Sequence, residues 1–289
     1  MSELNVEEKI KELINDFDGN VNFYINDEKG NELKYNENEI VETASCIKLF
    51  ILIEYYNQIM QNRKTRDDMI SYSPEQDYVE NGSGIIQYLE NLNLSSKNMA
   101  ILMMIMSDNI ATNKMIEYLG FENINNTIKT IGLKNTTLVA KKLDFNIYNS
   151  VGKTTAYEYA KAFEMILKKE ILTPELCDEI IELLSKQIYN TMIARFLPPL
   201  EVELKGTDDA YINYIASKSG GIGDEGRADI ENCRNDGGII STKAGNYIIS
   251  IFTSNFADHC FYADNPATIL GGKISKMVYD NFKNNGTIK

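Results

Sequence analysis

Tryptophan is absent from the 289-residue chain, proline occurs five times, cysteine four times and histidine once. The four cysteines (Cys46, Cys177, Cys233 and Cys260) are far apart and form no Cys-x-x-Cys pair. They indicate neither a disulfide framework nor a zinc site, so no metal and no cofactor is expected. His259 is the only histidine, and a histidine-based triad could form only through it. It lies in a polar turn and is interpreted as an incidental surface residue.

Positive charge is also scarce, with 29 Lys and Arg residues against 42 Asp and Glu residues and a net charge of −13. Nucleic acids and anionic membranes attract basic surfaces, so neither is expected as a main partner. No apolar run reaches the ~18 residues that a membrane span requires. Residues 1–9 lack the basic and apolar segments of a signal peptide. We expect a cytoplasmic monomer acting on a small molecule, or a secreted protein if a leader has been removed.

The hydrophobic periodicity predicts a helix and two strands, then a large helical block, then three strands and a closing helix. The expected helices cover 6–17, 47–60, 97–106, 110–119, 121–131, 155–167, 174–185 and 269–282, and the expected strands 21–25, 32–35, 211–217, 238–242 and 246–253. The nearly all-apolar helix over 97–106 is expected to be a central, buried one.

Strands from both ends of the chain most economically share one antiparallel sheet. We therefore expect a single α/β domain of the α+β type over 1–289, with terminal helices flanking the sheet. Residues 1–44 and 205–289 would form a sheet lobe. Residues 45–204 would form an inserted, all-helical lobe.

The most informative segment is Ser45-Cys46-Ile47-Lys48, at the start of an apolar helix. Serine is a favoured N-cap, so Ser45 also has a purely structural interpretation. Lys48 is harder to explain, because a helix N-terminus carries partial positive charge and favours acidic side chains. Residues three apart share one helical face, and burial together with the helix dipole lowers the pKa of a lysine. Lys48 could then accept the hydroxyl proton of Ser45, which makes Ser45 a candidate nucleophile.

Two further short motifs follow in order: Ser107-Asp108-Asn109 at a break between helices, and Lys218-Ser219-Gly220 at the end of an expected strand. Each alone has a structural explanation, because Ser, Asp and Asn favour turns and a strand-end lysine can simply be exposed. Second copies of the first two motifs occur at 150–153 and 96–98, but only one Lys-Ser/Thr-Gly is present. The copy at 150–153 lies in a polar loop and comes too late in the chain. One ordered set of three motifs therefore remains.

This ordered set resembles that of the serine β-lactamases and penicillin-binding proteins, and most closely that of class A β-lactamases. The resemblance covers nearly the whole chain. It implies a β-lactamase/transpeptidase-like fold and a mechanism that proceeds through an acyl-enzyme. Ser45 would be the acylated nucleophile, Lys48 its proton acceptor or relay, and Ser107 a proton shuttle to the leaving nitrogen.

The same resemblance implies how substrate would be held. Asn109 would hydrogen-bond the amide side chain of the substrate, while Lys218 and Ser219 would bind its carboxylate. The backbone N–H groups of Ser45 and Gly221 would form the oxyanion hole, whose donors stabilise charge that develops only in the transition state.

The resemblance fails at deacylation. Class A enzymes carry a Glu-x-x-Leu-Asn segment whose glutamate activates the hydrolytic water. Residues 138–149 contain no glutamate, and Asp144 is their only acid. Asp144 would have to lie closer to the water than a glutamate does, or it only caps its loop. The family often adds a carboxylate-binding arginine on the strand after Lys-Ser-Gly, and Arg234, just before the expected strand, is the candidate.

The expected function is a serine hydrolase, most closely a class A-like β-lactamase that hydrolyses the β-lactam amide with slow deacylation. Two alternatives stay open. One is a peptidase or esterase similar to penicillin-binding proteins. The other is a β-lactam-binding module that is acylated and does not turn over.

Overall fold

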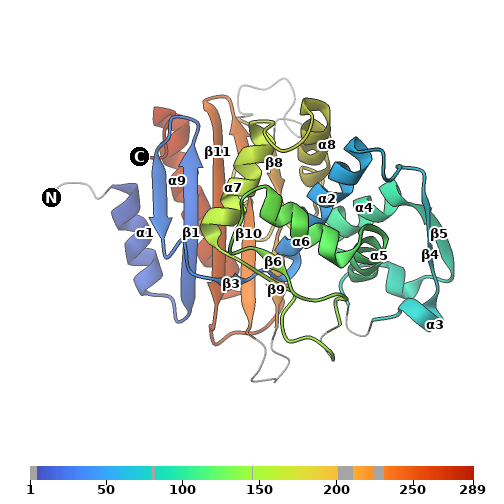
Figure 1. The fold of residues 1–289 in the computed structure, drawn as a ribbon. Helices are drawn as coiled ribbons and strands as arrows, with labels where there is room; N and C mark the ends of the chain where they lie inside the picture. The colour runs from blue at the N-terminus through green and yellow to red at the C-terminus, as the bar shows by residue number, and fades with distance from the viewer. Residues whose placement is uncertain (1–4, 80–81, 145, 201–210, 224–230) are drawn as a thin grey trace. The chain divides into compact units, whose positions relative to one another are not determined.

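In the computed structural model of the chain, the described residues are 5–79, 82–144, 146–200, 211–223 and 231–289. The chain forms two compact units (Figure 1). The first comprises Met1–Val41, Thr155–Glu164 and Asn190–Lys289, and the second Glu42–Thr154 and Met165–Tyr189. The single domain with lobes over 1–44 plus 205–289 and 45–204 stays a prediction, and its boundary at 204/205 lies outside the described residues.

The first unit contains a six-stranded sheet in the order β2-β1-β11-β10-β8, with β9 also paired to β10. Every pairing is antiparallel. The strands are β1 (Asn20–Asp27), β2 (Glu32–Tyr35), β8 (Ile212–Ser217), β9 (Gly220–Ile222), β10 (Cys233–Thr242) and β11 (Gly245–Ser254). Strands from both ends of the chain thus share one sheet, which confirms the predicted fold class.

Helices cover both faces of this sheet. On one face, α1 (Val6–Asn15) and α9 (Pro266–Asn285) contribute Ile10 and Ile274 to an apolar cluster that includes Ile249 of β11. On the other face, Tyr159 of α7 (Ala156–Leu167) packs edge-on against Phe252 of β11. Ile249 and Phe252 point to opposite sides because successive strand residues alternate. Both faces of the sheet are therefore buried against helices.

The second unit is mainly helical. Its longer helices are α2 (Lys48–Met60), α4 (Ser96–Ile105), α5 (Asn109–Leu119), α6 (Phe121–Thr130) and α8 (Pro174–Leu184), and its short ones are η1 (Ala44–Ile47), α3 (Pro74–Asp77) and η2 (Ile86–Tyr88). Two small sheets accompany them: β4 (Met69–Tyr72) with β5 (Leu92–Ser95), and β3 (Val41–Glu42), β7 (Gly152–Thr154) and β6 (Thr137–Leu138). The prediction that residues 45–204 form an all-helical lobe is therefore wrong, because β4, β5, β6 and β7 lie in this range. Strands this short give too little alternation to be predicted from sequence.

The central helix of the second unit is α2. Every residue from 48 to 56 is buried, which is typical of a helix that is apolar on all sides. The methionine-rich α4 instead buries one side, including Met99 and Met103, while Ile101 and Leu102 are half-buried. The prediction of α4 as the central helix is therefore wrong, and the helix that follows Ser45 takes that place.

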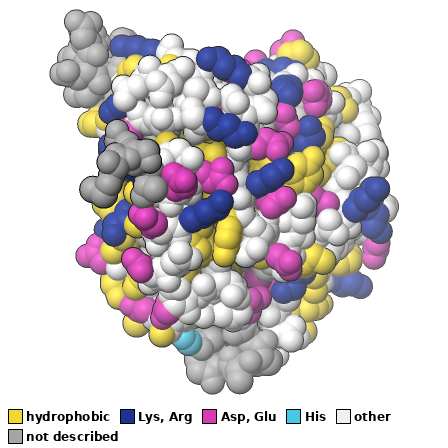
Figure 2. Space-filling model, turned by 90° about the vertical axis from the view of Figure 1, so that its left-hand side faces the viewer, with side chains coloured by type: hydrophobic (Ala, Val, Ile, Leu, Met, Phe, Trp, Pro, Cys, Tyr) yellow, Lys and Arg dark blue, Asp and Glu magenta, His cyan; other side chains and the backbone are white. Residues whose placement is uncertain are grey.

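Within the ranges described, no helix is long and apolar enough to cross a membrane. The face in Figure 2 shows acidic and basic side chains interspersed with apolar ones, and no continuous positive area forms on its described part.

Candidate active site

Ser45 lies inside η1, and not at a helix N-cap as its structural interpretation requires. The N-cap of η1 is Thr43, and α2 begins at Lys48 after Ile47. From residue 41 to residue 56, Ser45 is the one residue that is not buried. The preceding residue, Ala44, has a φ of 46°. A non-glycine residue in this region costs of order 1–3 kcal/mol and commonly marks a functional turn.

Lys48 is fully buried, and its side-chain nitrogen contacts the Ser107-Asp108-Asn109 motif. The Lys48 Nζ lies 2.6 Å from the carbonyl oxygen of Ser107, 3.0 Å from Ser107 Oγ and 2.8 Å from Oδ1 of Asn109. The structure thus brings together three residues from two motifs that are about 60 positions apart in sequence.

These contacts suit proton transfer. The Ser107 carbonyl and the Asn109 amide oxygen only accept hydrogen bonds. Lys48 has at least two N–H donors whether it is neutral or protonated, so it can donate to both oxygens in either state. The Ser107 hydroxyl both donates and accepts. It can accept from a protonated Lys48 or donate to a neutral one. One geometry therefore fits the lysine before and after a proton has moved between Lys48 and Ser107.

Asp108 holds the motif in place, a role that sequence analysis missed. Its buried carboxylate caps α5 through the Ala111 N–H at 2.9 Å and accepts the N–H groups of Ile85 and Ile86 at 2.7 and 2.9 Å. Gly84 is needed here, because a Cβ at that position would lie 2.2 Å from the carboxylate. The neighbouring Ser107 has a φ of 51°, a second strained residue in this group.

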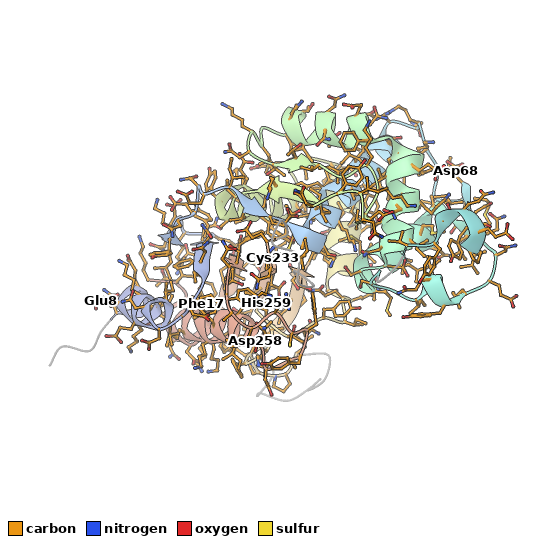
Figure 3. The ribbon with its side chains drawn as sticks, turned by 90° about the horizontal axis from the view of Figure 1, so that it is seen from below. Glu8, Phe17, Asp68, Cys233, Asp258 and His259 are labelled. Atoms are coloured by element: carbon orange, nitrogen blue, oxygen red, sulfur yellow. The ribbon has the colours of Figure 1, made fainter. Side chains whose placement is uncertain are left out.

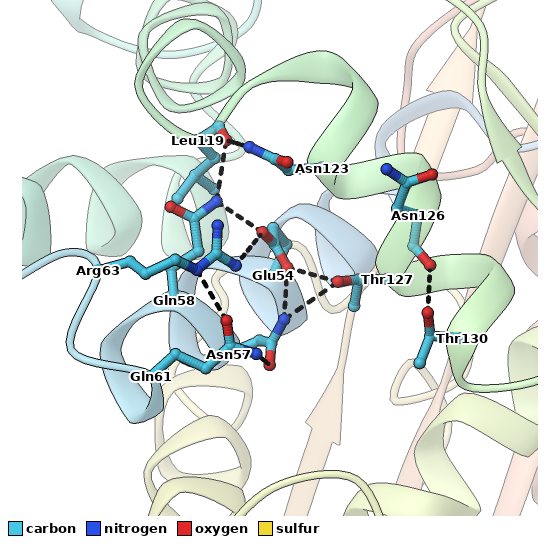
Figure 4. A network of polar contacts seen from close by, with 10 residues as sticks. All are labelled: Glu54, Asn57, Gln58, Gln61, Arg63, Leu119, Asn123, Asn126, Thr127 and Thr130. Atoms are coloured by element: carbon cyan, nitrogen blue, oxygen red, sulfur yellow. Dashed lines mark hydrogen bonds and ion pairs between the residues drawn. The ribbon is translucent and has the colours of Figure 1, made fainter.

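A separate polar network stabilises the second half of α2 (Figure 4). The side chain of Glu54 is 1% exposed and pairs with Arg63 at 3.4 Å. Its carboxylate also accepts hydrogen bonds from Asn57, Gln58 and Thr127 at 2.5–2.8 Å. A cavity of about 230 Å³ adjoins this network. Glu54 lies six residues beyond Lys48, about 9 Å along the helix, so the network stabilises α2 outside the candidate catalytic group.

Lys218, Ser219 and Gly221 belong to the first unit. Lys218 follows β8, is fully buried, and donates from Nζ to the Ser219 carbonyl at 2.7 Å. Its own carbonyl accepts the hydroxyl of Tyr159 at 2.7 Å. Ser219 and Gly221 are half-buried, the latter in β9. The backbone around the motif is therefore fixed by α7 and by the sheet.

Asp236 in β10 is another buried carboxyl to which sequence analysis gave no role. Its oxygens accept the Gly237 N–H at 2.9 Å and the Ile193 N–H at 3.2 Å. Burial raises the pKa of Asp236 to about 7, against the opposing effects of the Lys218 charge and these two N–H groups. In the sequence, Asp236 could have been singled out only by its position, as an acid on the strand next to Lys-Ser-Gly.

Arg234 lies within β10, opposite Gly221 in β9, so the prediction that it precedes the strand is wrong. Its guanidinium donates to the carbonyl oxygens of Ile222, Cys233, His259 and Cys260 at 2.7–3.0 Å. It also stacks on the ring of Phe261 at 3.8 Å. Burial lowers the pKa of Arg234. These contacts tie β10 to the loop that contains His259, near Cys233 and Asp258 in Figure 3.

Asp144 caps its own loop. Its Oδ1 accepts the Asn146 N–H at 3.0 Å, and its carbonyl accepts the N–H groups of Ile147 and Tyr148. This geometry is the Asx turn expected of an aspartate in a loop. Within the described ranges, no three His, Cys, Asp or Glu side chains cluster closely enough to hold a metal ion.

The fold is the β-lactamase/transpeptidase-like one that the motifs implied. Residues 5–282 match the model of the β-lactamase enzyme family, and the chain belongs to that family. The protein is thus a β-lactamase-like serine hydrolase that acts on β-lactam amides. No curated protein matches the chain.

Solved structures share this fold. A β-lactamase from Sphaerobacter thermophilus is 23% identical, with a TM-score of 0.79 and 94% of each chain covered. PBP-A is 24% identical, with a TM-score of 0.80 and 96% of each chain covered. The TLA-3 extended-spectrum β-lactamase is 18% identical, with a TM-score of 0.82 over 96% of this chain and 98% of that one. These likenesses confirm the fold predicted from the sequence.

Proposed function

We propose that this protein is acylated by β-lactams at Ser45 and releases the hydrolysed product slowly. The observation that supports it most directly is the contact of the buried Lys48 with both Ser107 and Asn109. Ser45 attacks the β-lactam carbonyl while Lys48 takes its proton, and Ser107 passes a proton to the leaving nitrogen. The ring C–N bond breaks as the Ser45 ester forms.

Other residues in and beside the three motifs bind the substrate in this proposal. Lys218 and Ser219 bind the substrate carboxylate, and Asn109 binds the amide side chain. The N–H groups of Ser45 and Gly221 stabilise the oxyanion. Loss of one such donor typically lowers the rate by a factor on the order of 10²–10³. The protein acts as a monomer on a small molecule.

Slow deacylation is proposed because Asp144, the only acid between 138 and 149, caps its own loop. A carboxylate that accepts a neighbouring N–H is held by the loop and is less available to activate water. Arg234 is proposed to support β9 and β10 and not to bind substrate directly, because its guanidinium donates to four carbonyl groups.

A second candidate function is a β-lactam-binding module that stays acylated. The geometry of Asp144 favours it equally, and PBP-A gives a related case, since a variant of it has been solved as an acyl-enzyme complex with penicillin G. A cycling enzyme and a binding module differ only in how long the adduct survives.

Intact-mass spectrometry after brief mixing with benzylpenicillin tests both. We expect an adduct that forms within the mixing time, decays slowly, and is absent in Ser45→Ala. Steady release of product with a decaying adduct identifies the enzyme, and a stable adduct identifies the module. Labelling that persists in Ser45→Ala would disprove the assignment of the nucleophile.

A further inference from the structure

Glu42 is a buried carboxylate placed three residues before the candidate nucleophile, and neither sequence analysis nor the family resemblance assigns it a role. It is 3% exposed. Its Oε1 accepts the N–H of Ala44 at 3.1 Å. Ala44 is the residue with positive φ that immediately precedes Ser45. The carboxylate therefore binds the strained residue of the nucleophile turn directly.

The same carboxylate binds a second segment more than 100 positions away in sequence. Its Oε1 also accepts the N–H groups of Val151 and Gly152 at 3.1 and 3.2 Å. Its Oε2 accepts the Ser150 hydroxyl at 2.5 Å and pairs with Lys153 at 3.3 Å. Residues 150–153 directly follow the loop that contains Asp144. Glu42 thus joins the nucleophile turn to the end of that loop.

The backbone around this junction is closely packed. The Thr43 N–H donates to the Gly152 carbonyl at 2.9 Å. A Cβ at Gly152 would lie 2.8 Å from Ile47 and 2.9 Å from the Thr137 carbonyl. The two segments therefore meet without room for another side chain. A shift of either segment changes the position of the other.

We propose that Glu42 is a positioning residue for acylation, which holds Ala44 at positive φ and so directs the Ser45 N–H and hydroxyl. This inference rests on the proposed acylation of Ser45. The peptide between Ala44 and Ser45 carries the N–H assigned to the oxyanion hole, and its direction depends on the Ala44 backbone angles. Without the Glu42 acceptor, Ala44 relaxes toward negative φ, and this N–H turns away from the developing oxyanion.

The test measures the acylation rate constant and the dissociation constant of the initial complex, using stopped-flow mixing with a chromogenic cephalosporin. We expect Glu42→Ala to slow acylation about 10²-fold, the loss typical for one oxyanion donor, and to leave the initial dissociation constant unchanged. Glu42→Gln should retain most of the rate. Its amide oxygen can face the three backbone N–H groups, and its NH₂ can donate to Ser150.

Asp27 provides a matched control. It is also a buried carboxylate, and it accepts the N–H groups of Lys29, Asn31 and Ile288 at 2.9–3.2 Å. Asp27→Ala removes a similar number of hydrogen bonds but should acylate at the wild-type rate. Equal slowing in Asp27→Ala and Glu42→Ala would mean that general loss of stability explains both, and would overturn the proposal.

A rescue experiment addresses Ala44 directly. Glycine adopts positive φ without strain. Ala44→Gly in the Glu42→Ala background should therefore recover part of the acylation rate, and no recovery would contradict the proposed mechanism. If Glu42→Ala does not fold, Glu42→Asp is measured in its place. Its carboxylate is one methylene shorter and cannot reach both segments, so acylation should slow in this variant as well. Wild-type protein that forms no adduct at all would instead disprove the proposed function.

Discussion

Three backbone N–H groups donate to the buried carboxylate of Asp108. Replacing Asp108 by asparagine removes the charge and one of the two acceptor oxygens. Asparagine has a single acceptor oxygen, and its NH₂ group must face donors on the other side. If the oxygen stays with Ala111, the N–H groups of Ile85 and Ile86 both lose their acceptor. Hydrogen bonds to charged groups contribute about 1.5–3 kcal/mol each, so this orientation costs roughly 3–6 kcal/mol.

The opposite orientation is cheaper. If the amide oxygen faces Ile85 and Ile86, only the cap bond to Ala111 is lost, which costs about 1 kcal/mol. The two remaining bonds become neutral, and each is then about half as strong. The two weakened bonds together lose about 1.5–3 kcal/mol, so the sum with the lost cap is about 2.5–4 kcal/mol. We therefore expect Asp108→Asn to adopt this orientation and to lower the free energy of unfolding by that amount.

Urea denaturation at 25 °C, followed by circular dichroism, measures this loss. Asp144→Asn is the matched control, because it makes the same change at a half-buried carboxylate whose Oδ1 accepts a single N–H in a loop. It should change the free energy of unfolding by less than about 1 kcal/mol. Acylation should also slow in Asp108→Asn, since Ser107 and Asn109 flank the altered residue. A loss below about 0.5 kcal/mol would refute the claim that this carboxylate fixes the motif.

Three further predictions follow from individual side chains. Lys48→Arg should reduce the acylation rate at least about 10²-fold, because a guanidinium does not release its proton, and adduct formation at a normal rate would exclude Lys48 as the base. Asp144→Asn should leave the adduct lifetime nearly unchanged if Asp144 only caps its loop, whereas a much longer lifetime in the mass spectrum would show that it activates water. Asp236 has a pKa raised to about 7 by burial, so the folded state holds a proton that the unfolded state has lost above pH ~4. Its contribution to stability is complete below pH ~4 and falls by up to about 1.4 kcal/mol per unit as pH rises toward 7. Urea denaturation across this range should therefore show a decline that Asp236→Asn reduces, and an equal decline in both proteins would contradict the assignment.

Hydrophobic periodicity was sufficient to predict most long elements. The helices expected over 47–60, 110–119 and 121–131 match α2, α5 and α6 to within about one residue. Such elements are stabilised by neighbours three or four positions along the chain, so their pattern is present in the sequence itself. The three short motifs were recognisable for the same reason, because each spans only three or four residues.

The packing of those elements depended on contacts that no local pattern contains. The sequence did not indicate that α2, and not α4, is the buried helix, because both are strongly apolar and burial depends on what surrounds them. Nor did it show that Arg234 lies within β10 and binds four carbonyl groups. Its strand was expected to begin four residues later, at Gly238, where the apolar pattern is clearer.

The sequence by itself determined which residues could carry the chemistry: a serine and lysine three positions apart, followed by two ordered motifs. Only the tertiary structure decided how they are held. Lys48 meets Ser107 across 59 positions, and Glu42 joins Ala44 to a segment 108 positions away. Buried carboxylates such as Glu42 and Asp108 are stable only where several N–H groups converge on them. That convergence comes from the folded backbone, and neither residue stands out from any other acidic side chain in the sequence.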